Sequence, residues 1–312
     1  MNKLDLARRP MSAASLLTWG GGIVWRKLQI GSGSFRDLCK PAGTNEEDQL
    51  VNINKLMSMK GICSRREANE FVRRGLVEVD GRIAQLGDEV SRDASVRLLP
   101  KAEKEKKEDL SIMLHKPVNW ISQNSDAISK RDRNRLSIKL LTLENQSKKN
   151  VLHTSAYSRP LVPASLAGLA CAGRLDFESS GLLIFTQDGV VARKLIGQDS
   201  VIEKEYHVTV RAAGSASYLP LRIERLRHGL VLDEKPLKAA QVDLLDKSWV
   251  HPDAVFTLRF VLSEGRYRQI RRMCDLVGMQ VIRLHRVRVG DLLLGDLEEG
   301  KWREIDRRVF IN

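Results

Sequence analysis

The sequence of 312 residues is poor in aromatic residues and cysteine, and it has no long hydrophobic run. Phe, Trp and Tyr together make up 5% of the chain, and no apolar stretch approaches the ~18 residues that a membrane-spanning helix needs. The four cysteines are scattered without CxxC spacing, and the six histidines form no HxxxH or HExxH pair. This pattern fits a reducing compartment, and it argues against a disulfide framework or a metal site.

Acidic residues are also scarce relative to basic ones. The chain has 52 Lys and Arg against 39 Asp and Glu, which gives a net charge of +13. Such an excess indicates a polyanionic partner, and nucleic acid is the first candidate. An anionic membrane surface is the alternative. Because the sequence contains no sustained amphipathic basic helix, we expect no membrane association.

The first 40 residues contain seven Lys and Arg, two acidic residues and four serines, without the long apolar core of a secretory signal. This composition is typical of an organellar transit peptide. The triplet Gly20-Gly21-Gly22 would interrupt an amphipathic helix, so a disordered basic tail on a bacterial enzyme is the alternative. We therefore interpret residues 1–45 as a basic leader or tail. The predicted location is the mitochondrial or another organellar matrix, with the bacterial cytoplasm as the alternative.

Residues 51–100 predict a small module that contains two helices and a hairpin. A capping box from Ser64 to Glu67 opens the second helix, and Asp80-Gly81 is a common two-residue hairpin turn. Arginines of the second helix lie outside its apolar stripe or flank it, where they could bind RNA phosphates. These arginines are Arg65, Arg66, Arg73 and Arg74.

The charge run 101–109 has almost no apolar content, and we interpret it as a linker to a second domain over 110–312. The second domain shows strand patterns around 182–186, 204–210 and 256–262. A helix is predicted from apolar residues at positions i, i+3, i+4 and i+7, namely Ile270, Met273, Cys274 and Val277. The expected fold class is α+β, with a mixed, mostly antiparallel sheet.

The most informative stretch runs from Ala172 to Gly189. Asp176 lies in a Gly-flanked loop just before the apolar run Gly181–Thr186, which suits a strand buried on both faces. Asp188-Gly189 then forms a strong turn signal. Most loop aspartates only hydrogen-bond to nearby backbone, so this stretch alone leaves a surface turn and a functional carboxylate both open.

Three blocks of residues resemble one family. Gly173-Arg174-Leu175-Asp176 and the following residues to Gly189 closely resemble the catalytic motif of pseudouridine synthases, in particular the RsuA/RluB/RluE/RluF group that modifies ribosomal RNA. Lys204-Glu205-Tyr206 and then Glu264–Met273 follow in the family's order. The N-terminal module is similar to the αL RNA-binding module named after the fourth small-subunit ribosomal protein. Asn119 stands where the family has Gly, and Asn tolerates a positive φ.

This resemblance implies an enzyme that isomerises a specific uridine of ribosomal RNA to pseudouridine by flipping the base. The reaction needs no cofactor or metal, and the enzyme is expected to be a monomer when free. Asp176 would be the catalytic carboxylate, acting on the sugar or on the base. A carboxylate in a dry pocket keeps its charge only beside a cation, and Arg271 is the expected partner, with Arg272 as the alternative.

Tyr206 would stack on the uracil ring, although an interior strand tyrosine is the alternative interpretation. Arg174 would occupy the space left by the flipped base. The remaining predicted RNA contacts of this domain are Lys204, Arg266, Arg268 and Arg272.

A different class of function stays open at this point: a catalytically inactive RNA-binding factor that assists ribosome assembly and keeps the pseudouridine synthase fold. The presence of Asp176, Tyr206 and Arg271 together favours the enzyme, because an inactive protein has no need of all three.

Overall fold

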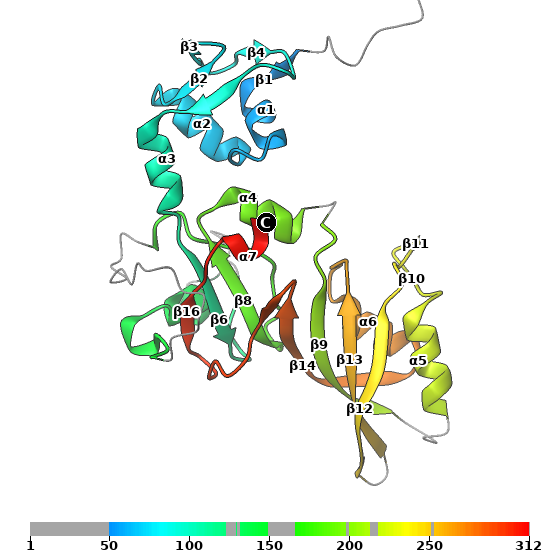
Figure 1. Cartoon of the computed structure of the whole chain (residues 1–312). Helices are drawn as coiled ribbons and strands as arrows, with labels where there is room; N and C mark the ends of the chain where they lie inside the picture. The colour runs from blue at the N-terminus through cyan, green and yellow to red at the C-terminus, as the bar shows by residue number, and fades with distance from the viewer. Residues whose placement is uncertain are drawn as a thin grey trace, which may run out of the picture. The chain divides into compact units, whose positions relative to one another are not determined.

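The computed structural model describes residues 50–122, 129, 132–148, 166–197, 200–212, 218–250 and 253–311 (Figure 1). The chain divides into two units, Met1–Asn45 and Glu46–Asn312. The predicted leader 1–45 lies outside the described residues.

The N-terminal module contains two short helices and five short strands. Ser64 begins the second helix as predicted: its backbone N–H donates to Glu67 Oε2 at 2.8 Å, and its hydroxyl accepts from the Glu67 N–H at 3.3 Å. The elements are β1 (Val51–Asn52), α1 (Ile53–Met59), α2 (Arg65–Arg73), β2 (Val77–Val79), β3 (Arg82–Ile83), β4 (Glu89–Val90) and β5 (Val96–Leu98). Leu56, Phe71 and Val77 belong to one buried core.

The charge run that the sequence predicts as a linker forms most of helix α3 (Pro100–Lys107). Pro100 stands in the first turn, where its missing N–H costs no hydrogen bond. Ala102 is fully buried in the core of the N-terminal module, and Lys106 is 6% exposed. The segment therefore contributes to packing as well as connecting the two parts.

The second domain is built on one large sheet with the strand order β12-β13-β9-β14-β8-β6-β16. Neighbouring strands on this path are antiparallel, apart from the parallel pair β14 and β8, so the predicted mixed, mostly antiparallel sheet is confirmed. The strands are β6 (Ser111–Lys116), β8 (Ser180–Thr186), β9 (Lys204–Ala212), β12 (Gln241–Val250), β13 (Asp253–Leu262), β14 (Met279–Val289) and β16 (Trp302–Glu304).

Shorter elements complete this domain. β7 (Ala170–Cys171) pairs with β8, β15 (Leu292–Leu293) pairs with β14, and β10 (Val231–Leu232) forms a separate hairpin with β11 (Lys235–Pro236). The 3-10 helices are η2 (Asp132–Arg135), η3 (Ser137–Leu140) and η4 (Leu143–Asn145).

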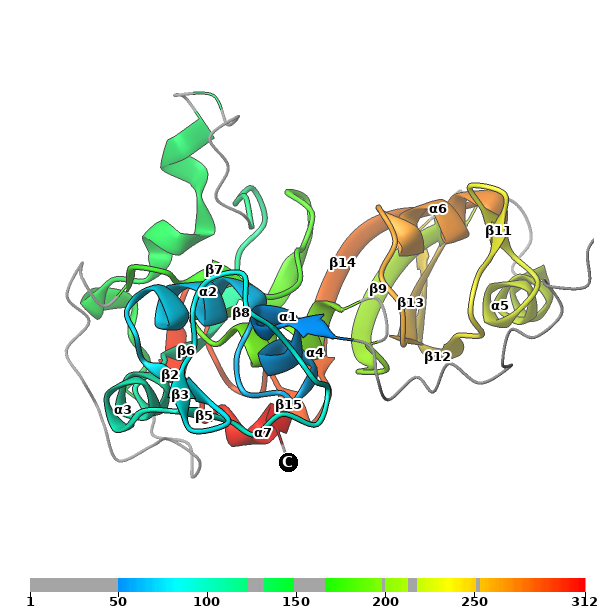
Figure 2. The same cartoon turned by 90° about the horizontal axis from the view of Figure 1, so that it is seen from above.

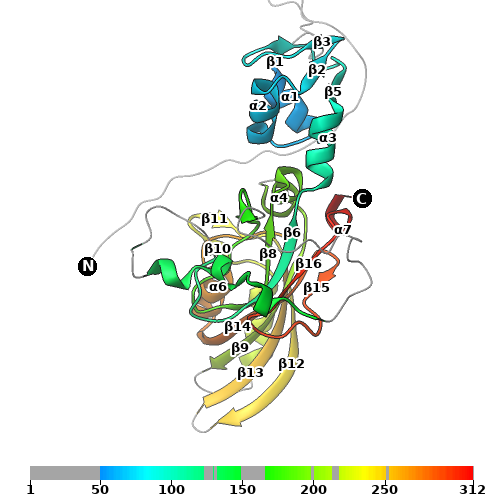
Figure 3. The ribbon, with the colours of Figure 1, turned by 90° about the vertical axis from the view of Figure 1, so that its left-hand side faces the viewer.

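Helices cover the two halves of the sheet separately. Helices α5 (Leu219–Arg227) and α6 (Gln269–Leu276) pack with β9, β12, β13 and β14 into one core (Figure 2). The predicted stripe of α6, which runs from Ile270 to Val277, is buried there and is confirmed. Helices α4 (Gly189–Ile196) and α7 (Arg308–Ile311) pack with β6 and β8 into another core (Figure 3). Every residue of β8 is buried, as the apolar run predicts.

Gly181 allows the two halves of the sheet to meet. It pairs with Arg286 where β8 runs parallel to β14, and its φ is +110°. A Cβ atom at this position would lie 2.2 Å from the Arg286 carbonyl oxygen, so only glycine fits. The loop that precedes β8 and carries Asp176 is thereby held beside β14.

The three cysteines of the described residues, Cys63, Cys171 and Cys274, are free. Among the helices that the structure describes, none has the length and apolar content to span a membrane.

Candidate active site

The Asp176 carboxylate lies between two arginines of the segment around the start of α6. Its Oδ2 atom is 3.7 Å from Arg271 Nε and 3.8 Å from Arg268 Nη1. The Asp176 side chain is 31% exposed, so solvent or a ligand can reach it. Of the two arginines that the sequence left open as partners, the structure brings Arg271 to Asp176. Arg272 forms a bidentate ion pair with Asp233, at 2.6 and 3.0 Å.

Arg271 is 8% exposed and also holds the end of the Asp176 loop. Its Nη2 donates to the Glu178 carbonyl oxygen at 3.3 Å and to Ser179 Oγ at 3.2 Å. Its Nε–H is buried without a hydrogen-bond partner in the part of the chain that is described, and faces Asp176 at 3.7 Å. An unpaired buried donor costs about 1–3 kcal/mol, which a small closure onto the carboxylate would recover. Catalytic hydrogen bonds are often this long without substrate.

Two residues that follow β6 hold the middle of the Asp176 loop. The Asn119 N–H donates to the Phe177 carbonyl oxygen at 2.7 Å, and Asn119 has a φ of +64°. The predicted tolerance of Asn for a positive φ is confirmed. Ser122 Oγ donates to the Leu175 carbonyl oxygen at 2.6 Å and accepts from the Leu175 N–H at 3.0 Å. The backbone on both sides of Asp176 is therefore fixed.

Lys116, the last residue of β6, lies beneath the same loop and is fully buried. Its Nζ donates to the carbonyl oxygens of Ser179 and Pro117, both at 2.7 Å. Burial lowers the pKa of Lys116 to about 8, although the nearby Asp176 carboxylate opposes this shift. Lys116 is not among the site residues predicted from the sequence. A lysine that ends an otherwise apolar strand is the signal that could have found it.

Arg286 holds the start of the loop and is 2% exposed. Its Nε donates to the Leu182 carbonyl oxygen at 2.7 Å, and its Nη2 reaches the Gly173 carbonyl oxygen at 3.3 Å. Arg286 is not among the predicted site residues either. Its partners are more than 100 positions away in the chain, and no local pattern distinguishes it from neighbouring arginines.

Tyr206 lies on β9, half-buried against the core beneath α6. In the sheet it is directly opposite Arg286 on β14 and Phe260 on β13. Directly opposed residues share a face of a sheet, so Tyr206 lies on the face from which Arg286 holds the Asp176 loop.

Two predicted RNA contacts differ in exposure. Arg174 is exposed, two residues before Asp176. Lys204 is half-buried, and its Nζ donates to the Ile202 carbonyl oxygen at 3.0 Å. Burial lowers the pKa of Lys204, with Arg286 adding repulsion.

Arg266 and Arg268, two further predicted RNA contacts, have local partners. Arg266 donates to the carbonyl oxygens of Leu232, Lys235 and Pro236, and so holds the β10–β11 hairpin. Arg268 Nη2 is 3.2 Å from Glu178 Oε2. Its backbone is left-handed, with a φ of +47°, which costs a non-glycine residue roughly 1–2 kcal/mol.

The four arginines at α2 fall into two pairs. Arg65 and Arg66 are exposed and form no ion pair among the residues that the structure describes. Arg73 contacts Glu70, and Arg74 forms a bidentate pair with Glu105 at 2.7 and 2.9 Å.

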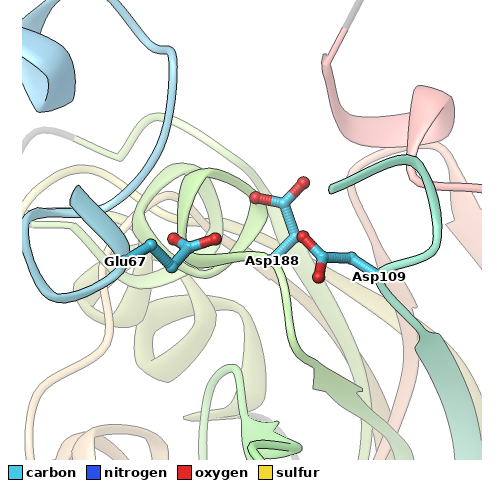
Figure 4. Close-up of side chains that lie close together, drawn as sticks. All are labelled: Glu67, Asp109 and Asp188. Carbon is cyan, nitrogen blue, oxygen red and sulfur yellow. The ribbon is translucent and has the colours of Figure 1, made fainter. Parts of the chain in front are cut away.

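Outside this site, three carboxylates lie close together: Glu67, Asp109 and Asp188 (Figure 4). Lys106 Nζ lies 2.9 Å from Glu67 and 3.4 Å from each of the other two. Arg307 Nη2 is 2.8 Å from Asp188. Burial raises the pKa of Asp109 to about 6, against the effect of Lys106. Because the chain's own cations fill the space among these acids, we interpret the cluster as structural.

Two family models match parts of this chain. A family model for RNA pseudouridylate synthase matches residues 110–276, and an S4 domain model matches residues 51–96. The dual-specificity RNA pseudouridine synthase RluF of Escherichia coli K12 is 31% identical over 264 residues, which cover 83% of this chain and 76% of RluF.

Other relatives are similarly distant. Ribosomal large subunit pseudouridine synthase B of Yersinia pestis is 30% identical, with 81% of this chain and 72% of the relative covered. An uncharacterized RNA pseudouridine synthase of Aquifex aeolicus is 29% identical, with 82% of this chain and 92% of the relative covered. A crystal structure of a pseudouridylate synthase has the same fold, with a TM-score of 0.50, 22% identity, and 84% and 98% of the two chains covered. The chain therefore belongs to the RNA pseudouridylate synthase family.

Proposed function

We propose that this protein isomerises a uridine of ribosomal RNA to pseudouridine and that Asp176 carries the reaction. The main support is the position of Asp176: a partly exposed carboxylate between Arg271 and Arg268, on a loop fixed by hydrogen bonds from other elements. Ribosomal RNA is favoured as substrate because the Yersinia pestis relative is named for the large ribosomal subunit.

The reaction rearranges one nucleotide and balances without a co-reactant. The bond between C1′ of the ribose and N1 of uracil breaks, and N1 keeps the electron pair. The base turns and bonds to C1′ through C5, C5 loses its proton, and N1 gains one. The Asp176 carboxylate acts as the nucleophile, at the sugar or at the base.

Neighbouring groups serve this carboxylate. Arg271 and Arg268 stabilise its negative charge, at 3.7 and 3.8 Å. Lys116 holds the Ser179 carbonyl oxygen, which fixes the position of the loop. Tyr206 supports the uracil ring from the sheet. In this arrangement the protein positions a carboxylate before the substrate arrives, which avoids the cost of reorganising the site during the reaction.

The target uridine must leave its stack, at a cost of roughly a few kcal/mol. Arg174 is exposed beside Asp176, and its planar guanidinium can stack in the vacated space. The module over 51–100 adds RNA affinity through Arg65 and Arg66, and the domain over 110–312 performs the chemistry. The protein acts as a monomer when free, on ribosomal RNA or on a ribosome-assembly intermediate.

The composition of residues 1–45 supports import into mitochondria or another organelle, with the bacterial cytoplasm as the alternative location. Fusing these residues to a fluorescent protein tests this part of the proposal. A fusion that stays outside organelles in a eukaryotic cell would contradict it.

The decisive test is to map pseudouridines in ribosomal RNA from cells with and without the protein. We expect one or a few sites to disappear without it and to return with the wild-type gene. The purified protein should form the same sites on unmodified transcripts. A protein that binds this RNA but forms no pseudouridine would instead be an inactive assembly factor.

A further inference from the structure

Exposed aromatic side chains are rare among the residues that the structure describes, and two of them adjoin the active site. Among the Phe, Tyr and Trp side chains whose burial the structure describes, three are exposed: Phe177 at 38%, Tyr218 at 59% and Tyr267 at 73%. Phe177 follows Asp176 directly, and Tyr267 precedes Arg268. The core does not use these two rings, so they are available to a ligand of the site.

Phe177 presents its ring from a rigid backbone. Its carbonyl oxygen accepts the Asn119 N–H at 2.7 Å, and the next residue but one, Ser179, is held by Lys116 and Arg271. The Arg135 guanidinium carbon lies over the Phe177 ring, 5.9 Å from its centroid. A planar group that approached the rest of the ring would meet a stacking surface bordered by a cation.

Tyr267 is connected to the same loop through its neighbour. The Arg268 side chain reaches Glu178 at 3.2 Å and Asp176 at 3.8 Å, and these acids lie on either side of Phe177 in the chain. The left-handed backbone of Arg268, with a φ of +47°, turns the chain directly after Tyr267. The two aromatic residues therefore adjoin opposite ends of one ion pair, which spans the loop and the start of α6.

The charges around these rings indicate an RNA ligand. Arg135 lies over the Phe177 ring, Arg268 follows Tyr267 in the chain, and Arg174 stands three residues before Phe177. Arginine beside exposed aromatic rings suits a single-stranded nucleic acid, whose bases stack on the rings while its phosphates pair with guanidinium groups.

We propose that Phe177 and Tyr267 are stacking platforms for the two nucleotides that flank the flipped uridine. This inference rests on the proposed function and extends it to substrate choice. Arg174 occupies the space between the two neighbouring bases, so each ring stacks on the face that its base turns away from that space. This face is free only where the neighbouring base lies outside a continuous duplex. The site therefore selects a uridine whose neighbours are unpaired, as in an RNA loop, over a uridine inside a continuous duplex.

The test uses the full chain with Asp176→Asn, so that no turnover occurs during the binding measurement. The probe is an RNA hairpin with a seven-nucleotide loop and one central uridine. Two further hairpins carry an abasic nucleotide immediately 5′ or immediately 3′ of that uridine. Fluorescence anisotropy gives the dissociation constants, and we expect each abasic change to weaken binding about tenfold.

The inference predicts a specific coupling between protein and RNA changes. Phe177→Leu should remove the effect of one abasic position, and Tyr267→Leu should remove the effect of the other. Tyr267→Phe keeps the ring, so it should retain the abasic effect that Tyr267→Leu removes. Tyr218→Leu is the matched control, because it removes another exposed tyrosine, at the start of α5, and should leave both abasic effects unchanged.

Two results would overturn the inference. One is equal binding of all three hairpins by the Asp176→Asn protein. The other is that the abasic effects persist, within about twofold, in both leucine variants. Neither result bears on turnover, which is measured separately as pseudouridine formation by the wild-type protein. A failure of the proposed reaction would leave the coupling intact, so the two failures can be distinguished.

Discussion

Arginine is used differently in the two parts of this protein. On α2, Arg65 and Arg66 are exposed, whereas near Asp176 the side chains of Arg271 and Arg286 are 8% and 2% exposed. An exposed guanidinium stays hydrated and attracts phosphates over a distance that salt shortens. A buried guanidinium donates to fixed oxygen atoms and sets their geometry. The comparison indicates that α2 supplies affinity, whereas the buried arginines supply position.

The strongest test of this division is Asp176→Asn, which removes the negative charge beside the buried Arg271 and the partly exposed Arg268. We expect pseudouridine formation to fall at least about 10³-fold, because the amide cannot act as an anionic nucleophile. The Asp176 side chain is 31% exposed, so the substitution should change the unfolding free energy of the protein by less than about 1 kcal/mol. RNA affinity should stay within about threefold, since α2 is unchanged. Turnover, thermal denaturation and RNA titration measure the three quantities. An active Asn variant would remove Asp176 from the chemistry.

Arg271→Met tests position more directly. It removes the donors to Glu178 and Ser179 and leaves Asp176 without its more buried partner. We expect a loss of activity of about 10²-fold and a loss of stability of about 2 kcal/mol, measured by turnover and denaturant titration. Arg272→Met is the matched control: its ion pair with Asp233 lies on the surface, so the stability change should be below about 1 kcal/mol. Equal effects of the two substitutions would contradict the role assigned to Arg271.

The sequence predicted those parts of the site that depend on local pattern. Asp176 before an apolar strand and the buried stripe of α6 each follow from neighbouring residues, and the structure bears out both elements. Lys116, Ser122 and Arg286 escaped prediction because their importance comes from hydrogen bonds to residues 53 to 113 positions away. Such long-range contacts leave no periodic pattern in the sequence.

Several arginines that the sequence predicts as RNA contacts have partners within the protein. Arg266 and Arg272 stand in a basic block, but their guanidinium groups contact the β10–β11 hairpin and Asp233 within the protein. Arg74 is similarly paired with Glu105, which lies in the segment predicted as a linker. Charge counts locate a basic surface, whereas the partners that each arginine has within the fold decide how available it is.

The pH dependence of stability tests whether Lys116 is as enclosed as the structure indicates. Its pKa is about 8 in the folded protein and 10.5 ordinarily. Between these values the unfolded chain holds a proton that the folded chain has lost, so unfolding becomes harder as pH rises through this window. Between pH 8 and 10.5, the free energy of unfolding of the wild-type protein should rise by on the order of 2 kcal/mol relative to that of Lys116→Met. Denaturant titrations of both proteins across this range measure the difference. Parallel curves would show that Lys116 titrates as a solvated lysine.

The smallest expected effect belongs to α2 and completes the comparison. Arg65→Ala with Arg66→Ala removes two exposed cations without breaking an ion pair among the described residues. If each contacts one RNA phosphate, the slope of log affinity against log salt should become shallower by about 1.4 to 1.8. Turnover at saturating RNA should not change, because Asp176 and its buried partners are intact.

Arg73→Ala with Arg74→Ala is the matched control for this experiment, since it removes the same charge from the same helix. These arginines already contact Glu70 and Glu105. If they leave these acids to bind phosphate, the freed carboxylates attract cations, so the net release of counterions is smaller. We expect a smaller change in salt slope than for Arg65 and Arg66. If both double variants shift the slope equally, the ion pairs of α2 open on RNA binding, and all four arginines bind phosphate. If neither shifts it, the affinity comes from arginines near Asp176, and the division between the two regions is wrong.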